Sequence, residues 1–271
     1  FPVDMQFIKD RSGTTFSWFL STRLTQGNYL STESTAAEVA NSVYSHDYQN
    51  GWGNYSSANG ITSWMWKRHA GFDVLTYAGV SATRTIQHSM GKVPEMMWIK
   101  SRTSTDGWEV YHKGLNGGTT PASYSLRLDT SATESNIGAT GKWSDITSTS
   151  VTLHSNGGVN FNSKDFIMML FASVSGISSV GYYDGSSSSQ TISTGFAPRF
   201  VMIKCTTNAE DWYLLDTTRG WASGNDNILR PNLDAAQYSN DLGAPTSTGF
   251  TLTVDNGSNA AGRKYIYYAH S

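Results

Sequence analysis

Aromatic side chains in polar loops are the residues of this chain best suited to binding chemistry. Five of them stand among Ser, Thr, Asn and Gly rather than in apolar runs: Tyr44, Tyr48, Trp52, Trp143 and Trp221. A loop Trp or Tyr can stack on the apolar face of a sugar ring while neighbouring Asn, Asp and Ser side chains bond its hydroxyls, and recognition loops use these residue types. The pattern predicts glycan contact, with coverage of a small core as the structural alternative.

Paired carboxylates could support hydrolysis of a glycosidic bond, which requires two carboxyl groups about 5 to 9 Å apart across a cleft. Asp106 with Glu109, and Glu134 with Asp145, are the pairs that could meet. All four stand in loops rich in Gly, Ser and Thr, where a solvated turn residue is the simpler explanation. We therefore predict that the chain is not an enzyme and has no catalytic residue.

The histidines, the single cysteine and the acidic turns do not form a complete catalytic or metal signature. His46 beside Asp47, and His112 beside a Tyr, resemble a base with its orienting group, but no Gly-x-Ser-x-Gly elbow accompanies them. The segment 255–259 resembles part of a calcium loop and lacks the terminal Glu. Cys205 follows a strand-like run and is interpreted as a structural thiol. We predict no metal and no cofactor.

Three stretches of the chain repeat one another in the same order. Each contains a strand-like run ending in Ile-Lys, a Trp eight or nine residues further on, a Leu-x-x-polar-x-x-Ala-x-Glu/Gln signature, and a closing Asn before an aromatic strand. A period of about 90 to 105 residues suits an array of small domains rather than a solenoid. The residues predicted to fill the repeat cores are Ile8, Ile99, Ile203, Trp18, Trp108, Trp212, Leu30, Leu126 and Leu229.

Composition and alternation predict the fold class. Charged residues make up 15% of the 271, against about 25% in ordinary globular domains, and the chain has 26 Gly. Apolar and polar residues alternate along Phe250–Val254, which places one face of a strand in a core, and Asn-Gly pairs punctuate such runs as hairpin turns. We predict an all-β protein built as antiparallel, jelly-roll-like β-sandwiches in tandem.

Charge and hydropathy exclude two classes of partner. The net charge is −2 and Lys and Arg do not cluster along the sequence, so the electrostatic footprint of a nucleic-acid-binding protein is missing. The longest apolar run, Phe166–Ala172, is far shorter than the ~20 residues that a membrane helix requires. We therefore predict neither nucleic-acid binding nor membrane insertion.

The repeats place domain boundaries at 1–71, 72–176 and 177–271. The second and third units each open with a strand pair that the first unit lacks. The missing strands predict an exposed sheet edge in the first unit, which upstream chain or a neighbouring subunit would cover. Both ends of the sequence resemble cuts within strands, so we expect a longer polypeptide.

The repeat anchors resemble a domain family of uncharacterised virion structural proteins of tailed bacteriophages, many of them marine. The third unit fits best, whereas the second has His112-Lys113-Gly114 at the characteristic turn and the first lacks a recognisable Gly-Phe-x-Leu strand. The matching residues of the third unit are Ile203-Lys204, Trp212, Asp216-Thr217-Thr218-Arg219-Gly220, Gly249-Phe250-Thr251-Leu252, Asn259 and Tyr265-Ile266.

This resemblance implies a component on the virion exterior, assembled in the host cytoplasm, as a tail fibre, another appendage or a capsid fibre. Its implied partners are other virion proteins and a host-surface glycan, and phage fibres that resemble it imply a homotrimer. Weak sites repeated along such an array would gain avidity. Two alternatives are a tailspike-type polysaccharide depolymerase and a purely architectural capsid decoration protein without a ligand.

Overall fold

The computed structural model describes residues 1–11, 17–25, 27–53, 60–255 and 257–271. Every ladder between named strands in them is antiparallel. The predicted all-β class with antiparallel sheets is confirmed, and no helix of the described part is long and apolar enough to cross a membrane. The helices described are four 3₁₀ turns: η1 (Arg23–Thr25), η2 (Leu115–Gly118), η3 (Pro121–Ser123) and η4 (Thr217–Arg219).

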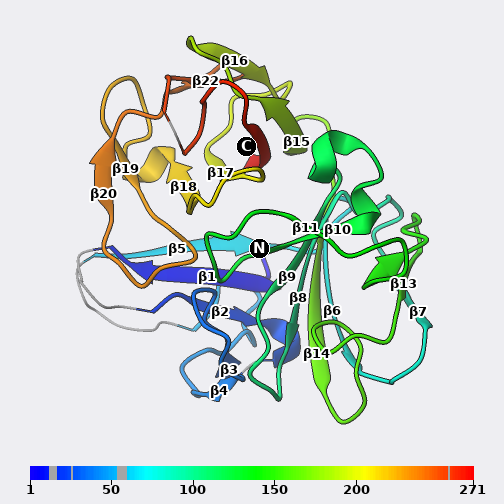
Figure 1. Ribbon diagram of the computed structural model, residues 1–271. Helices are drawn as coiled ribbons and strands as arrows, with labels where there is room; N and C mark the ends of the chain where they lie inside the picture. The colour runs from blue at the N-terminus through cyan, green and yellow to red at the C-terminus, as the bar shows by residue number, and fades with distance from the viewer. Residues whose placement is uncertain (12–16, 26, 54–59, 256) are drawn as a thin grey trace.

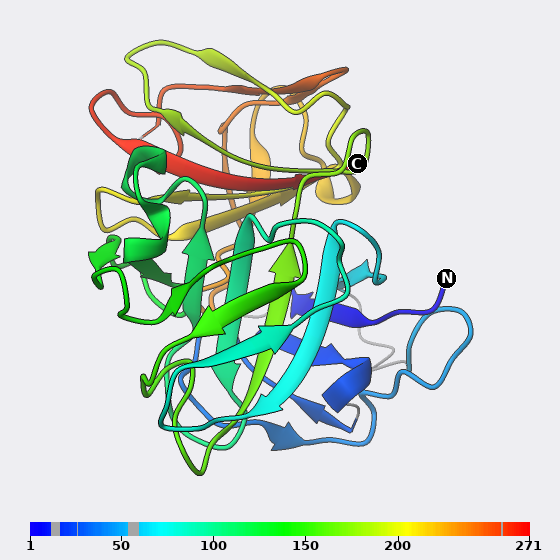
Figure 2. The same cartoon turned by 90° about the vertical axis from the view of Figure 1, so that its right-hand side faces the viewer.

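Three sheets face the centre of the molecule, one from each segment that the sequence boundaries define, and we call the segments first, second and third (Figures 1 and 2). The sheet of the first segment has the order β2 (Phe19–Thr22), β1 (Met5–Asp10), β5 (Ile61–Trp66). That of the second is β11 (Ser135–Asn136), β10 (Tyr124–Arg127), β9 (Glu109–His112), β8 (Met96–Ser101), β14 (Asp165–Phe171), β6 (Phe72–Ala78). That of the third is β18 (Trp212–Asp216), β17 (Phe200–Cys205), β23 (Lys264–His270), β15 (Ser178–Asp184).

Outer sheets cover the central sheets of the second and third segments. They are β12 (Trp143–Ser144), β13 (Ser150–Leu153), β7 (Arg84–Gln87) in the second, and β16 (Gln190–Ser193), β22 (Gly249–Leu252), β21 (Pro245–Thr246) in the third. Two small pairs complete the described strands: β3 (Asn28–Tyr29) with β4 (Val39–Ala40), and β19 (Asp226–Ile228) with β20 (Tyr238–Asn240).

Alternation along the central strands supplies two cores at once. In β8, Met96 and Trp98 belong to a cluster at the centre of the molecule, while Met97 and Ile99 belong to the core under the outer sheet. Successive side chains of a strand point to opposite faces, so a strand buried on both faces is apolar at nearly every position. The second and third segments therefore have the two-sheet packing of a β-sandwich.

The largest hydrophobic cluster is shared by all three segments. It contains Phe7 and Trp18 of the first, Trp98 of the second, and Met202 and Tyr268 of the third, among others. We expected separate packing units along an array, and the structure differs in this respect, because the segments bury their central faces against one another. The boundaries themselves, and the tandem duplication, stay predictions.

The repeated tryptophans join different segments. Each indole N–H donates to a backbone carbonyl of another segment, and the three bonds follow one another round the molecule, from first to third, third to second and second to first. The bonds are Trp18 Nε1 to the oxygens of Arg230 and Leu233 (both 3.0 Å), Trp212 Nε1 to that of Arg127 (2.9 Å), and Trp108 Nε1 to that of Ser31 (2.9 Å).

Each of these indoles bonds a carbonyl within the Leu-x-x-polar-x-x-Ala-x-Glu/Gln signature of another segment. Its polar residue accepts the backbone N–H of the Trp in its own segment, and the backbone N–H of its Glu or Gln donates to a carbonyl in a neighbouring one. The first set is Glu33 to Trp18 (3.3 Å), Asp129 to Trp108 (2.9 Å) and Asn232 to Trp212 (2.9 Å). The second set is Glu38 to Arg102 (2.8 Å), Glu134 to Thr206 (2.9 Å) and Gln237 to Arg11 (3.4 Å).

The lysines that end the Ile-Lys runs are fully buried, and two of them bond a neighbouring segment. Lys9 Nζ donates to the Asp234 carbonyl of the third segment (2.8 Å), and Lys204 Nζ donates to that of Ser131 in the second (3.3 Å). Desolvation lowers the pKa of Lys204 to about 8. Lys100 Nζ instead donates to carbonyls of its own segment, those of Ser101 (2.7 Å) and Ser104 (3.2 Å), so the bonds of Lys9 and Lys204 are the ones that fix joints between segments.

One sheet edge distinguishes the first segment. β5 closes its sheet and has no second neighbour among the described residues, whereas the equivalent strands β14 and β23 pair on both sides. The first segment also lacks an outer sheet in the described part. Asn59, its predicted closing Asn, lies outside the described residues.

Candidate functional site

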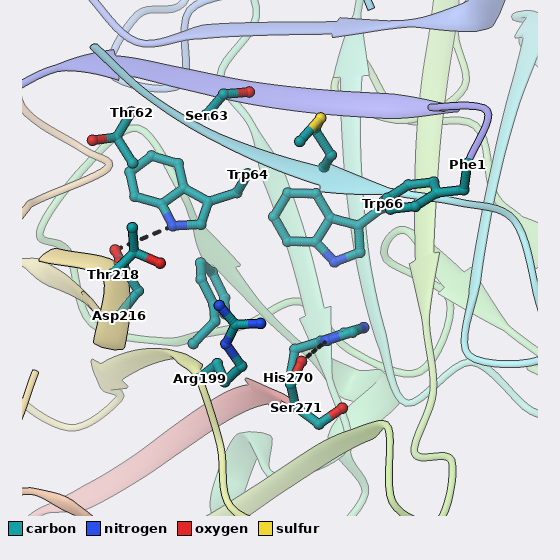
Figure 3. Close-up of a pocket in the computed structure, with 12 residues that line it drawn as sticks. Phe1, Thr62, Ser63, Trp64, Trp66, Arg199, Asp216, Thr218, His270 and Ser271 are labelled. Atoms are coloured by element: carbon teal, nitrogen blue, oxygen red, sulfur yellow. Dashed lines mark hydrogen bonds between the residues drawn. The ribbon is translucent and has the colours of Figure 1, made fainter. Parts of the chain in front are cut away.

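A cavity of about 360 Å³ lies beside β5, between the first and third segments, and we call it the β5 cavity (Figure 3). Aromatic side chains of β5 and β17 form its wall, and polar residues of the third segment form its rim. Its lining residues are Phe1, Thr62, Ser63, Trp64, Met65, Trp66, Arg199, Phe200, Asp216, Thr218, His270 and Ser271.

Two tryptophans on one face of β5 set the aromatic wall. Trp64 and Trp66 point to the same face because they are two residues apart in a strand. Trp66 is buried, meets the Phe200 ring edge-on at 5.7 Å and donates its indole N–H to the Tyr268 hydroxyl (3.1 Å). Trp64 is only half-buried and donates to Asp216 Oδ2 (3.2 Å). The wall is thus rigid at Trp66 and accessible at Trp64.

Asp216 is held in place by hydrogen bonds to η4. Its carboxylate accepts the backbone N–H of Arg219 (2.9 Å) and the guanidinium Nε of the same residue (2.6 Å), as the cap of η4. The Arg219 guanidinium also lies 5.5 Å from the centre of the Trp64 ring. Desolvation lowers the pKa of Arg219, and the Asp216 carboxylate beside it opposes that change. The pair therefore stabilises the cavity wall.

The rim offers polar groups that can meet a ligand. Arg199 and Thr218 are exposed, and the Arg199 side chain makes no ion pair with another described residue. His270 is half-buried, its Nδ1 lies 3.0 Å from the Ser271 carbonyl oxygen, and burial lowers its pKa. These groups and the indole of Trp64 can bind by stacking and hydrogen bonding.

The predicted glycan-contact residues are not brought together, and three of them are buried. Tyr44 and Trp143 are fully buried and Trp221 nearly so, which corrects the expectation that their rings are presented at the surface. Trp143 packs edge-on against Tyr111 at 5.9 Å, and Trp221 donates to the Gly243 carbonyl (2.8 Å). Their polar sequence neighbours concealed that each loop folds back over a core.

Two members of that set keep exposed surface. Tyr48 is 50% exposed and Trp52 is half-buried, and both follow Tyr44 in the loop 41–53. This loop therefore retains the residue types that stack on a sugar. Tyr48 and Trp52 do not line the β5 cavity, although Gly51 of the same loop donates its N–H to the carbonyl of Phe1, which does (3.0 Å).

The nine residues predicted to fill the repeat cores are all buried. The tryptophans and leucines lie in the shared central cluster, where the tryptophans also make the bonds between segments. The nine buried residues are Ile8, Ile99, Ile203, Trp18, Trp108, Trp212, Leu30, Leu126 and Leu229.

The carboxylates considered for hydrolysis each have a separate partner. Asp106 pairs with Lys164 (2.6 Å), which helps to lower its pKa against the effect of burial. Glu109 is buried between Arg127 (2.6 Å) and Lys142 (2.5 Å). These contacts use the carboxylates to fix loops.

The second pair of carboxylates likewise has separate partners. Glu134 Oε2 accepts the backbone N–H of Asn116 (2.7 Å), and burial raises the pKa of its carboxyl. Asp145 follows β12, adopts a positive φ of 42° and accepts the Ser144 hydroxyl (3.1 Å). Neither residue lines the β5 cavity.

The two histidines considered as bases are buried structural groups. His46 Nε2 lies 2.9 Å from the Ser21 hydroxyl, and His112 Nε2 lies 3.1 Å from the Tyr267 carbonyl oxygen of the third segment. Burial lowers the pKa of both, that of His112 to about 3, so His112 is neutral at pH 7. The fully buried Cys205 lies in the core of the third segment.

The calcium-like stretch forms a narrow turn. Asp255 and Asn259 are bridged through their backbones, and Asn256 between them lies outside the described residues. In the part of the chain that the structure describes, no three His, Cys, Asp or Glu side chains could hold a metal ion together.

Sequence reasoning placed Trp64 and Trp66 in a closing strand but did not select them as site residues. The signal was present, because an aromatic face on a strand without its usual neighbour predicts an uncovered apolar surface. What the sequence did not reveal is that η4 of the third segment would stand opposite that face.

The fold and the cavity define an all-β protein with three antiparallel central sheets around a shared core, in which β5 has no second neighbour among the described residues. The family model described as "Domain of unknown function (DUF7483)" matches residues 1–271, so the chain belongs to this family. No curated protein and no solved structure matches the chain.

Proposed function

We propose that this chain is a non-enzymatic structural module of a tailed-bacteriophage virion, in a tail fibre or another exterior appendage, and that it contributes to attachment to a host-surface glycan. The resemblance of the third segment to phage structural proteins motivates the proposal. The observation that supports it most is that the repeat anchors hold three segments together: each repeat Trp bonds a carbonyl of another segment.

The turn that contributes most to the resemblance has a structural use here. Asp216 caps η4, Arg219 returns to its carboxylate, and Gly220 follows with a φ of 99°, which a residue with a side chain rarely adopts. A motif that shapes a turn fits a protein whose work is to assemble and to present surfaces.

The attachment part of the proposal is carried by Tyr48 and Trp52. Gln49 and Asn50 beside them are exposed. The Gln49 amide can bond sugar hydroxyls, whereas the Asn50 amide oxygen accepts the terminal ammonium of Phe1. A single shallow contact of this kind binds weakly, so attachment would depend on many copies in one particle.

The depolymerase alternative receives less support. It would need Asp106 with Glu109, or Glu134 with Asp145, to share a cleft, and none of the four lines the β5 cavity. The ion pair of Asp106 with Lys164 also helps to lower the pKa of that carboxyl, the opposite of what a general acid requires.

Mass spectrometry and image reconstruction of purified phage particles test the virion role. We expect the chain in stoichiometric amounts on the particle exterior, and sizing of the purified protein to give a trimer. Its absence from particles would sink the proposal. A glycan array then separates attachment from pure architecture, because an architectural protein would show no hit, whereas an attachment protein would show hits that Tyr48→Ala and Trp52→Ala weaken.

A further inference from the structure

The β5 cavity lies where two other segments of the molecule carry a strand. The buried lysines set a common register: Lys9 pairs with Thr62, Lys100 with Ile167 and Lys204 with Ile266. Counting from them, Trp64 of β5 corresponds to Met169 of β14 and to Tyr268 of β23. The three closing strands are therefore equivalent in position.

Both other closing strands are covered along their far edge. β6 runs antiparallel to β14 over seven residue pairs, and β15 runs antiparallel to β23 over seven. β5 has no such neighbour in the described residues.

The open edge of β5 presents unpaired backbone groups. The Arg11 N–H bonds the Gly60 carbonyl (3.0 Å), and bonded positions alternate along an antiparallel ladder, so Ile61, Ser63 and Met65 turn their N–H and C=O groups away from β1. The Ser63 hydroxyl is buried and also lacks a partner among the described residues. An edge of this kind is a template for another strand.

The 3₁₀ turn that lies opposite the open edge of β5 matches the arrangement in the other two segments. β6 contacts η1 of the preceding segment, and β15 contacts η2 of the segment before it. Continued round the molecule, the same arrangement places a strand on β5 against η4, and Thr218 of η4 lines the β5 cavity (Figure 3). The cavity thus has the boundaries of a missing strand.

We propose that the β5 cavity binds an extended segment of a partner protein, which pairs antiparallel with β5 and completes the sheet. The two covered edges define the chemistry of the segment. Val74 of β6 lies opposite Met169 and Val180 of β15 lies opposite Tyr268, so the partner places a β-branched residue opposite Trp64. In both strands a Tyr follows three residues later, Tyr77 and Tyr183.

The source of the strand is another protein rather than a second copy of this chain. The two described strands that carry the Val-x-x-Tyr pattern, β6 and β15, are already paired along their length, so a second copy would have to unfold to donate either. The exposed guanidinium of Arg199 at the rim favours a neutral or acidic segment over a basic one. This inference goes beyond the proposed virion role and does not depend on it.

Synthetic peptides with the sequences of residues 72–78 and 178–184 serve as probes, because both are strands of the required pattern. We expect saturable binding, a change in tryptophan fluorescence from Trp64, and amide exchange in residues 61–66 slowed by about tenfold or more at saturation. A 72–78 peptide with Pro in place of its Leu is the control. That Leu pairs with Met168, the equivalent of Ser63, so its N–H would face the open edge of β5; Pro removes this donor and the peptide is not expected to bind.

Two variants of the protein test the location. Ser63→Pro removes an N–H from the open edge, where Pro is tolerated, and Thr218→Trp fills the cavity from the exposed η4 side. Both should fold, as circular dichroism would verify, and both should lose peptide binding, whereas Tyr48→Ala should bind as the parent does.

Three outcomes overturn the proposal. The first is unchanged exchange in residues 61–66 with either peptide, including the case in which these amides are already protected in the free protein. The second is equal binding by the parent, Ser63→Pro and Thr218→Trp. The third is a dimer whose formation alone protects β5, which would make a second copy the occupant.

Discussion

The closing strands of the first and second segments, β5 and β14, occupy equivalent positions in the fold and differ in the burial of their side chains. In β14 six of the seven residues are buried, whereas in β5 only one of the six is buried. Both pair with an Ile-Lys strand in the same register, so the difference does not arise from that pairing. It arises from the neighbours, because β14 has β6 at its edge and an outer sheet over its face, and β5 has neither among the described residues.

Some hydrogen bonds of each segment form independently of its neighbours, whereas the burial of its closing strand depends on adjacent strands and on an outer sheet. Within each segment, the Trp and the polar signature residue bond each other regardless of the outer sheet. The indole N–H groups of the same tryptophans bond other segments and hold the three segments together. An open edge in one segment therefore leaves the centre packed and creates a cavity at the periphery.

The largest difference in the free energy of unfolding should come from substitutions at one equivalent position in β14 and β5. Leu170 is fully buried under the outer sheet and pairs with Met97, and Met65, which pairs with Gln6, is 42% exposed. Leu170→Ala should lower the free energy of unfolding by about 2–5 kcal/mol. Met65→Ala should change it by no more than about 0.5 kcal/mol. Urea unfolding measures both, and equal losses would refute the difference between the edges.

Acid titration should test the joint between the second and third segments. His112 has an ordinary pKa of 6.5, lowered to about 3 in the folded chain by burial, with Lys113 also lowering it and Glu95 opposing. Above pH 6.5 both states hold it neutral, whereas below this pH only the unfolded chain takes up a proton. His112 alone should therefore lower the free energy of unfolding by about 1.4 kcal/mol per pH unit from pH 6.5 towards pH 3.

The matched variant is His112→Asn, whose side chain can still accept the Gly114 N–H that His112 Nδ1 accepts at 2.9 Å. Its stability should depend less steeply on pH over the same window, by about the slope that His112 contributes. His46, His69 and His270 also have lowered pKa values, and they remain in both proteins, so the difference isolates His112. Parallel curves for parent and variant would show that this histidine is not the cause.

A smaller difference in the free energy of unfolding should separate Trp108, whose indole bonds another segment across the shared core, from Trp64, whose indole lines the β5 cavity. Trp108→Phe leaves the Ser31 carbonyl without its donor and should cost about 1–3 kcal/mol. Trp64→Phe removes a bond to Asp216, which keeps Arg219, and the site is half-buried, so the cost should stay below about 1 kcal/mol. Thermal unfolding would measure both, and the reverse order would contradict the assignment of Trp108 as a joint.

The sequence predicted the fold class and the buried anchors because both depend on local patterns. Alternation in Phe250–Val254 and the recurrence of Trp18, Trp108 and Trp212 are readable without a structure. It did not predict that these tryptophans bond other segments, since that depends on how three sheets meet round one core. Tyr44 and Trp143 were misplaced for a related reason: a polar loop that crosses a core buries its aromatic residue.

The smallest effect on stability should come from the exposed loop, where function is proposed instead. Tyr48→Ala should leave the free energy of unfolding within about 0.5 kcal/mol of the parent, because half of its side chain already faces solvent. Tyr44→Ala is the buried counterpart in the same loop and should lose about 3–5 kcal/mol, as large aromatic deletions in cores do. If Tyr48 contacts a glycan, Tyr48→Ala should lower the glycan-array signal at unchanged stability. A signal that falls only in the destabilised Tyr44→Ala protein would assign the loop a packing role, and would leave the β5 cavity as the functional surface of this chain.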